Sequence, residues 1–161
     1  MFFESLFRAL YEKRIDYCVV GGVALVLQGA VRMTADLDLM VALDEPNLTR
    51  FIEVIKGLGY RPKVPVEPEN FISAENRESW IRDKGMQVFS FYHPGEMVSL
   101  VDVFVHEPVP YCEMRERIEL KPIDDFMIPV ASKTDLIRLK KISGRPQDLE
   151  DIKALEALLN A

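Results

Sequence analysis

The sequence predicts an α/β (α+β) protein, in which a mixed β-sheet carries helices over one face and is followed by two C-terminal helices. Two observations support this class. Apolar residues recur at helical spacing in some segments, and elsewhere they alternate or form short continuous runs. The expected helices and strands also interleave along the first half of the chain, whereas the chain closes with two consecutive helices. A mixed sheet accommodates this order of elements.

The first 60 residues contain three helical segments separated by two strands. Phe3, Phe7 and Leu10 share one helical face, and the pair Gly21-Gly22 ends a short apolar strand. We expect helix 2–13, strand 16–20, helix 23–28, strand 36–41 and helix 46–58.

The middle of the chain is less regular. Three prolines between residues 61 and 68 predict an irregular link. The sequence His93-Pro-Gly-Glu96 predicts a turn between two strands. We expect helix 71–84, strands 86–92 and 98–105, a short helix or turn at 109–116, and short strands at 118–120 and 126–130 around a turn at 124–125.

The last 30 residues predict two helices. Ser132 is typical of an N-cap, with Asp135 in the third helical position, and this helix is expected to end near Gly144. Pro146 opens the final helix in its first turn, where proline is tolerated. The chain length of 161 residues predicts one domain, with a sheet core over 1–131 and a helical pair over 132–161.

Composition excludes several classes of protein. The chain is 48% hydrophobic and 29% charged, as in an ordinary globular protein. Cys18 and Cys112 form no disulfide or metal pattern, and Cys18 is expected in the core. No signal peptide and no apolar run near the roughly 20 residues of a membrane span are visible, so a cytoplasmic protein without a membrane role is expected.

The charge balance argues against general binding of nucleic acid. The net charge is −6 at pH 7, so there is no overall excess of cations to neutralise phosphates. General DNA binding is therefore not expected. A local basic face remains compatible with this balance, and the tract from Arg138 to Arg145 is one candidate for it.

Three aspartates stand where strands otherwise hold apolar residues. Asp36 and Asp38 lie two apart and project from one strand face, with Cβ atoms roughly 6–7 Å apart. Asp102 lies inside the apolar run of residues 98–105. Burying an unpaired carboxylate is costly, so a cation is expected among them, and Mg²⁺ bound to a phosphate is the best candidate. A structural Ca²⁺ site, or ion pairs with Arg32 or Lys140, are the alternatives.

The glycine pair is the second candidate feature. Gly21 and Gly22 end a strand and open a helix, a placement that presents backbone N–H groups to an anion. A tight turn without a ligand is the alternative interpretation.

These motifs together resemble a known family. The segments Gly21-Gly-Val-Ala-Leu-Val-Leu-Gln-Gly29, Arg32-Met-Thr34 and Asp36-Leu-Asp38 resemble the signature of the polymerase-β-like nucleotidyltransferase superfamily. The best match is its minimal bacterial branch, which includes the nucleotidyltransferases of toxin–antitoxin and abortive-infection systems. The C-terminal segments 132–140 and 145–152 also resemble that branch.

The resemblance implies an activity and a role for each acid. It implies transfer of a nucleoside monophosphate from a nucleoside triphosphate to a hydroxyl, on a nucleotidyltransferase core. Asp36 and Asp38 would hold Mg²⁺, and Asp102 would act as third ligand and as base for the attacking hydroxyl.

The resemblance also implies roles on the nucleotide side. Gly21 and Gly22 would cradle the phosphates, Thr34 would position the acids and Arg32 would contact phosphate. Family members often carry a serine after the first glycine, whereas Gly22 offers no hydroxyl to the γ-phosphate.

The C-terminal helices add polar candidates. Lys140 or Lys141 is placed to neutralise the triphosphate as a point charge. Asp148 and Asp151 are further candidates, and an exposed Arg145–Asp148 pair of little energetic weight is the alternative.

Three functions remain open from sequence. The leading one is an Mg²⁺-dependent nucleotidyltransferase in a toxin–antitoxin-like system, whose acceptor is a tRNA end, a partner protein such as a toxin, or a small molecule. The second is a catalytically weak, antitoxin-like module that neutralises its partner by contact. The third is a sensor that binds the nucleotide–Mg²⁺ complex without turnover.

Overall fold

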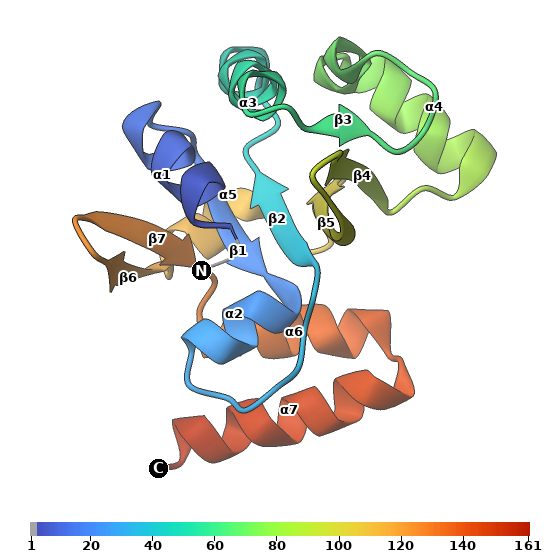
Figure 1. Cartoon of the computed structure of the whole chain (residues 1–161). Coiled ribbons are helices and arrows are strands. Elements are labelled where there is room, and N and C mark those ends of the chain that lie inside the picture. Colours follow the sequence, from blue (N-terminus) through green and yellow to red (C-terminus); the bar gives the residue numbers. More distant parts are fainter. Residues whose placement is uncertain (1–2) are drawn as a thin grey trace.

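The structure, a computed structural model, describes residues 3–161, and within them one sheet of seven strands forms the centre of the molecule (Figure 1). The start of the expected first helix, at residue 2, lies outside the described residues. The strands are β1 (Tyr17–Val20), β2 (Leu37–Val41), β3 (Arg61–Pro62), β4 (Val88–His93), β5 (Glu96–Phe104), β6 (Glu119–Ile123) and β7 (Phe126–Val130). Their order across the sheet is β3-β4-β5-β2-β1-β7-β6.

The sheet is mixed, as the sequence predicts. Strand β1 runs antiparallel to β2 and parallel to β7, and β2 runs parallel to β5. The outer pairs β3–β4, β4–β5 and β6–β7 are antiparallel. The helices are α1 (Glu4–Glu12), α2 (Gly21–Leu27), α3 (Glu45–Gly57), the 3₁₀ helix η1 (Pro68–Ile72), α4 (Ala74–Lys84), α5 (Tyr111–Arg115), α6 (Lys133–Ser143) and α7 (Pro146–Leu159).

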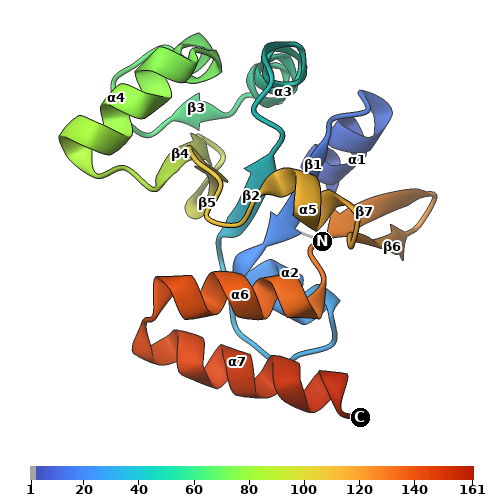
Figure 2. The same ribbon diagram turned by 180° about the vertical axis from the view of Figure 1, so that it is seen from behind.

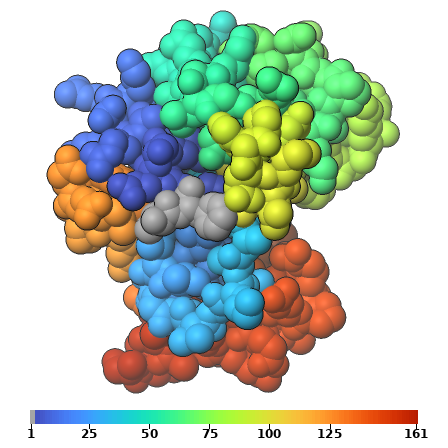
Figure 3. All heavy atoms as spheres, in the orientation of Figure 1, coloured from blue at the N-terminus to red at the C-terminus, as the bar shows by residue number. Residues whose placement is uncertain are grey.

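The helices divide around the sheet. Helix α1 lies in front of the sheet in Figure 1 and contacts α3, whereas the view from behind in Figure 2 shows the short helix α5 on the other face. Helices α6 and α7 pack against each other, and α6 contacts α2 below the central strands. The segment that leads into β2 lies beside the turn between β4 and β5, as the space-filling view shows (Figure 3).

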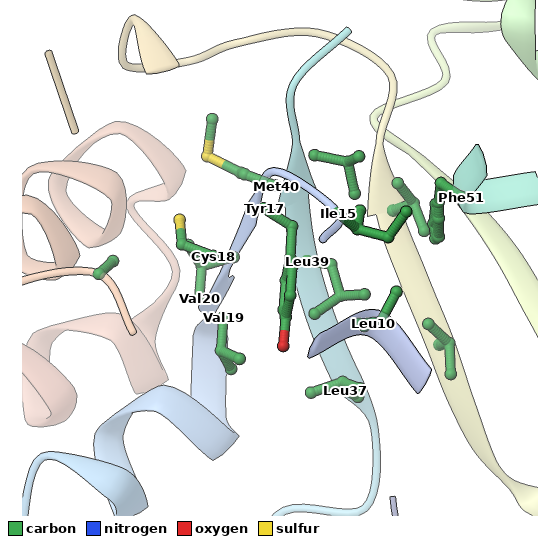
Figure 4. Packing of buried hydrophobic residues seen from close by; sticks show 14 of the residues in the cluster. Leu10, Ile15, Tyr17, Cys18, Val19, Val20, Leu37, Leu39, Met40 and Phe51 are labelled. Carbon is green, nitrogen blue, oxygen red and sulfur yellow. The ribbon is translucent and has the colours of Figure 1, made fainter. Parts of the chain in front are cut away.

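One apolar core holds these elements together. Strands β1 and β2 are buried along almost their whole length, and Leu10 of α1 and Phe51 of α3 pack over them (Figure 4). Cys18 lies in this core, as expected. Within residues 3–161 no helix has the length and apolar character needed to cross a membrane.

Several expected boundaries were wrong, among them the short strand expected at 118–120, which is β6 at Glu119–Ile123. Three further differences have a clear physical reason. Residues 61–62 form the edge strand β3 inside the expected irregular link, and an edge tolerates Pro62. Helix α4 begins at Ala74 rather than near residue 71, because the Ser73 hydroxyl accepts the hydrogen bond of the Asn76 N–H. Helix α2 begins at Gly21, so the glycine pair forms the first turn of the helix rather than preceding it.

The C-terminal helix boundaries agree with expectation. The Ser132 hydroxyl caps α6 by accepting the Asp135 N–H at 3.1 Å, and Gly144 ends the helix in the left-handed conformation. Pro146 is the first residue of α7.

Candidate active site

Two neighbouring strands, β2 and β5, bring the candidate acids together. Asp38 of β2 lies opposite Val20 of β1 and opposite Asp102 of β5 in the strand register. Residues opposite one another in a sheet project from the same face, so Asp38 and Asp102 share a face. Asp36 is the residue just before β2, and it lines the same cavity as Asp38 and Asp102.

A cavity of about 420 Å³ lies at this point, between the strand ends, the loop before β2 and helix α6. Its volume falls in the usual range for small-ligand sites. All eight site residues predicted from sequence line it: Gly21, Gly22, Arg32, Thr34, Asp36, Asp38, Asp102 and Lys140. Sequence reasoning did not assign Phe104, Ser143 or Gln147, which also line the cavity.

The glycine pair is required by close packing within the protein. Gly21 has φ +69°, and a Cβ there would lie 2.1 Å from Asp38 Oδ2. A Cβ on Gly22 would lie 2.6 Å from Thr34 Oγ1 and 2.7 Å from Arg32 Nη1. Any larger residue at either position would therefore displace the side chains that line the cavity.

Asp36 and Asp102 are each held by a hydrogen bond. Asp36 Oδ1 accepts the backbone N–H of Leu100 at 2.9 Å, which ties the start of β2 to β5. The Ser90 hydroxyl of β4 donates to Asp102 Oδ1 at 2.6 Å. The only signal for Ser90 in the sequence is its polar side chain in the apolar run of β4.

Burial and neighbouring carboxylates raise the pKa of Asp38 and of Asp102. Burial, followed by the charges of Asp102 and Asp36, raises the pKa of Asp38 to about 7, against the opposing effect of Lys140 and Arg145. Burial also raises the pKa of Asp102, although the Ser90 hydrogen bond acts in the opposite direction. The three carboxylates of Asp36, Asp38 and Asp102 thus lie close to one another around this cavity.

The acids as arranged do not form a complete metal cage. Within residues 3–161, no group of three or more His, Cys, Asp or Glu side chains is gathered closely enough to hold a metal ion. The hydrogen bonds of Asp36 and Asp102 are made to groups on β5 and β4 respectively. An ion held here would use one or two carboxylates and complete its shell with other oxygens, which is the usual coordination of Mg²⁺.

The cations of the cavity are paired with a different set of acids. Lys140 Nζ lies 2.9 Å from Asp151 Oδ2 and 3.2 Å from Asp148 Oδ1, and Arg32 Nε lies 3.3 Å from Asp151 Oδ1. In the described part of the chain, no ion pair joins Arg32 or Lys140 to the strand acids. The alternative in which those cations pair with the strand acids therefore lacks support.

Arg145 and Asp148 do form the pair considered from sequence, but Asp148 is buried. Arg145 Nε lies 3.0 Å from Asp148 Oδ2, and the Asp148 side chain is only 1% exposed. Burial raises the pKa of Asp148, but hydrogen bonds from Arg145, Ser143 and Lys140 outweigh it, and the net effect lowers that pKa. Asp148 and Asp151 are thus buried carboxylates that form ion pairs with the cations lining the cavity.

Comparison with known proteins defines the fold. No family model and no curated protein matches the chain. Solved structures do match: the lincosamide antibiotic adenylyltransferase LnuA with lincomycin bound is 18% identical, with 96% of each chain covered and a TM-score of 0.59. ANT(2″)-Ia in complex with adenylyl-2″-tobramycin is 15% identical, with 98% of this chain and 87% of that chain covered and a TM-score of 0.64.

A third structure extends the likeness. An antigenic nucleotidyltransferase-like protein from Paracoccidioides brasiliensis is 21% identical, with 95% of this chain and 72% of that chain covered and a TM-score of 0.55. The chain has the nucleotidyltransferase fold. This confirms the fold expected from the glycine and aspartate motifs. At these identities the likeness extends to the fold alone, so an activity must be argued from the site.

Proposed function

We propose that this protein is an Mg²⁺-dependent nucleotidyltransferase that transfers a nucleoside monophosphate from a nucleoside triphosphate to a hydroxyl acceptor. The observation that carries the proposal is the convergence of Asp36, Asp38 and Asp102 on one cavity that also contains Lys140 and Arg145. Carboxylates for a divalent cation beside cations for phosphate are the parts that phosphoryl transfer requires.

The charges of the cavity support a need for divalent cations. The charged residues lining it are three acids, Asp36, Asp38 and Asp102, and three bases, Arg32, Lys140 and Arg145. Buried Asp148 and Asp151 pair with those bases. The protein alone therefore presents no excess positive charge to a triphosphate. Burial and, after it, the charges of Asp102 and Asp36 raise the pKa of Asp38, and a bound cation would oppose both effects.

Each group of residues in the cavity would have its own role in the reaction. Asp36 and Asp38 would hold the Mg²⁺, which neutralises phosphate charge when bound. Lys140 and Arg145, which line the same cavity, would neutralise the phosphates. Asp102 accepts the proton of the acceptor hydroxyl, whose oxygen forms a bond to the α-phosphorus. The bond from that phosphorus to the β-phosphate oxygen breaks, and pyrophosphate leaves.

Calorimetry on the four common nucleoside triphosphates, with and without Mg²⁺, tests the proposal. Wild type should bind at least one of them only with Mg²⁺, and Asp36→Ala/Asp38→Ala should lose that binding. The matched control is Glu78→Ala/Asp83→Ala, which removes two exposed acids of α4 and should bind as wild type. Absence of binding to folded wild type would contradict the proposal.

The toxin–antitoxin setting is a further part of the proposal. An enzyme that modifies a toxin or a tRNA loses its effect on the partner in Asp36→Ala/Asp38→Ala. A contact antitoxin keeps neutralising the partner in the same variant. The presence of all three acids in one cavity favours the enzyme.

A further inference from the structure

The sheet extends beyond Asp102 into a second surface. Strands β4 and β3 continue the sheet outward from β5, with Ser90 opposite Asp102 and Arg61 opposite Tyr92. Because opposite residues share a face, Ser90 projects on the same side as the candidate base Asp102. Tyr92 lies two residues further along β4, where burial still alternates next to the pairing irregularity between Phe91 and His93, so Tyr92 and its partner Arg61 lie on the same side. The surface is therefore continuous with the proposed catalytic site.

The two faces of this extension differ in burial. On the far face, Phe89, Phe91 and Val103 are buried, and Trp80 of α4 stacks on Phe89 with ring centres 5.1 Å apart. On the near face, Ser90 and Tyr92 are only half-buried. One face is thus packed under η1 and α4, whereas the other presents polar and aromatic groups to solvent.

Two cations border the near face. Arg61 and Lys63 are exposed, and neither forms an ion pair within residues 3–161. The Lys63 N–H donates to the Ser90 carbonyl at 2.9 Å, which places Lys63 beside Ser90 at the sheet edge. The positive charge of Lys63 also lowers the pKa of Asp102, a smaller effect than the burial that raises it. Two cations without an ion-pair partner in the described residues thus lie on the near face, on the side of the sheet that carries Asp102.

Two aromatic residues, Phe104 and Tyr92, lie on the near face. Phe104 is half-buried, lies two residues from Asp102 on the same face and lines the catalytic cavity. Tyr92 lies further out, opposite Arg61. We define the acceptor face as Arg61, Lys63, Ser90, Tyr92 and Phe104.

We propose that the acceptor face binds the end of a single-stranded nucleic acid and presents its terminal 3′-hydroxyl to Asp102. This inference rests on the proposed function and names its acceptor class. Aromatic rings that stack bases, combined with cations that follow the backbone, are the usual elements of single-strand binding. The acceptor face is a sheet surface beside the cavity whose two cations are exposed and whose other members are half-buried, whereas small ligands are held in cavities that bury most of their surface.

The proposal agrees with the acidic net charge of the chain. Two cations neutralise only about two phosphates, so the affinity should be modest and its salt dependence shallow, unlike that of a general nucleic-acid binder. Each phosphate contact on a single strand contributes about 0.7 to the slope of log K against log salt concentration. The acceptor face therefore predicts a slope contribution of about 1.4.

Fluorescence anisotropy with a labelled single-stranded RNA of about ten nucleotides tests the proposal. Wild type should bind the single strand and should bind the same sequence as a duplex less tightly. Arg61→Ala/Lys63→Ala should weaken binding and reduce the salt slope by about 1.4. The matched control, Lys13→Ala/Arg14→Ala, removes one lysine and one arginine that are also exposed and should leave both quantities unchanged.

Substitution of the aromatic ring tests stacking separately. Tyr92→Ala should weaken binding by about 5-fold to 100-fold, whereas Tyr92→Phe, which keeps the ring, should bind as wild type. Tyr11→Ala on α1 is the control, because Tyr11 is 49% exposed and lies outside the acceptor face. Equal melting temperatures for Tyr92→Ala and Tyr92→Phe exclude misfolding as the cause.

Failure of this inference differs from failure of the proposed function. Wild type that binds the Mg²⁺–nucleotide complex in calorimetry but not the single strand would overturn the acceptor assignment alone, and would indicate a protein or small-molecule acceptor. Single-strand binding that is unchanged in Arg61→Ala/Lys63→Ala and in Tyr92→Ala would also overturn it. Absence of Mg²⁺-dependent nucleotide binding by the folded wild-type protein would overturn the proposed function itself.

Discussion

Single residues of the cavity are constrained by close contacts. Gly21 combines a positive φ of +69° with a contact that leaves no room for a Cβ beside Asp38. We expect Gly21→Ala to cost at least about 1–2 kcal/mol for the left-handed backbone, and to abolish Mg²⁺-dependent nucleotide binding by displacing Asp38. Thermal unfolding and calorimetry measure both effects.

Gly57 provides the matched control for that substitution. A Cβ at Gly57, in the last turn of α3, has no heavy atom within 4 Å. Gly57→Ala should leave nucleotide binding intact and stabilise the protein by about 0.5–1 kcal/mol. Equal nucleotide binding by Gly21→Ala and wild type would contradict the packing argument.

The raised pKa of Asp38 predicts a pH dependence of stability. The pKa is about 7 in the folded protein, against an ordinary value of 3.8, so the folded state binds more protons between about pH 4 and pH 7. Stability of the metal-free protein should therefore fall as the pH rises through this window and level off above it. The loss is at most about 4 kcal/mol, from 1.36 kcal/mol per pKa unit.

Asp38→Asn isolates this contribution. The variant cannot ionise at this position, so its melting temperature in a chelator should change less between pH 5 and pH 8 than that of wild type. Mg²⁺ should recover stability at pH 8 in wild type but not in the variant. Parallel curves for the two proteins would refute the assignment to Asp38.

At the scale of elements, the buried ion pairs join α6 and α7 behind the cavity. Lys140 contacts both Asp148 and Asp151, and its side chain is 7% exposed. We expect Lys140→Met to destabilise the protein by about 3–5 kcal/mol in urea unfolding, because the two carboxylates lose a buried counterion. The double variant Lys140→Met/Asp151→Asn should recover part of this loss.

An exposed ion pair in α7 supplies the control. Lys153 pairs with Glu150 at 3.3 Å, with side chains 73% and 75% exposed. Lys153→Met should change the unfolding free energy by less than about 1 kcal/mol. Similar losses for Lys140→Met and Lys153→Met would show that the α6–α7 ion pairs contribute little.

The whole molecule should unfold as one unit. The sheet runs unbroken from β3 to β6, and one core cluster includes residues of the strands and of helices α6 and α7. Trp80 fluorescence reports on the outer strands through its contact with Phe89, and far-ultraviolet circular dichroism reports on all helices. The two melting curves should coincide, and an earlier fluorescence transition would indicate two separate units.

Much of this fold could be predicted from local signals. The Ser132 cap, the Gly144 stop and the first-turn proline Pro146 depend on neighbours in sequence, and all three agree with the structure. The same holds for the alternating strand at Asp38. Edge strand β3 was missed, because its partner β4 lies about 30 residues away and prolines dominate its own composition.

The sequence by itself determined the class of fold, the three acids and the glycine pair, because spacing of two and the steric demands of backbone turns are local properties. Only the tertiary structure decided which groups meet. The Ser90–Asp102 hydrogen bond and the Lys140–Asp151 ion pair each join residues that are distant in sequence, and the half-buried near face of β4 depends on which helices pack on the sheet. Strand order and helix docking set these contacts, since burial of the shared core selects one arrangement for the whole chain.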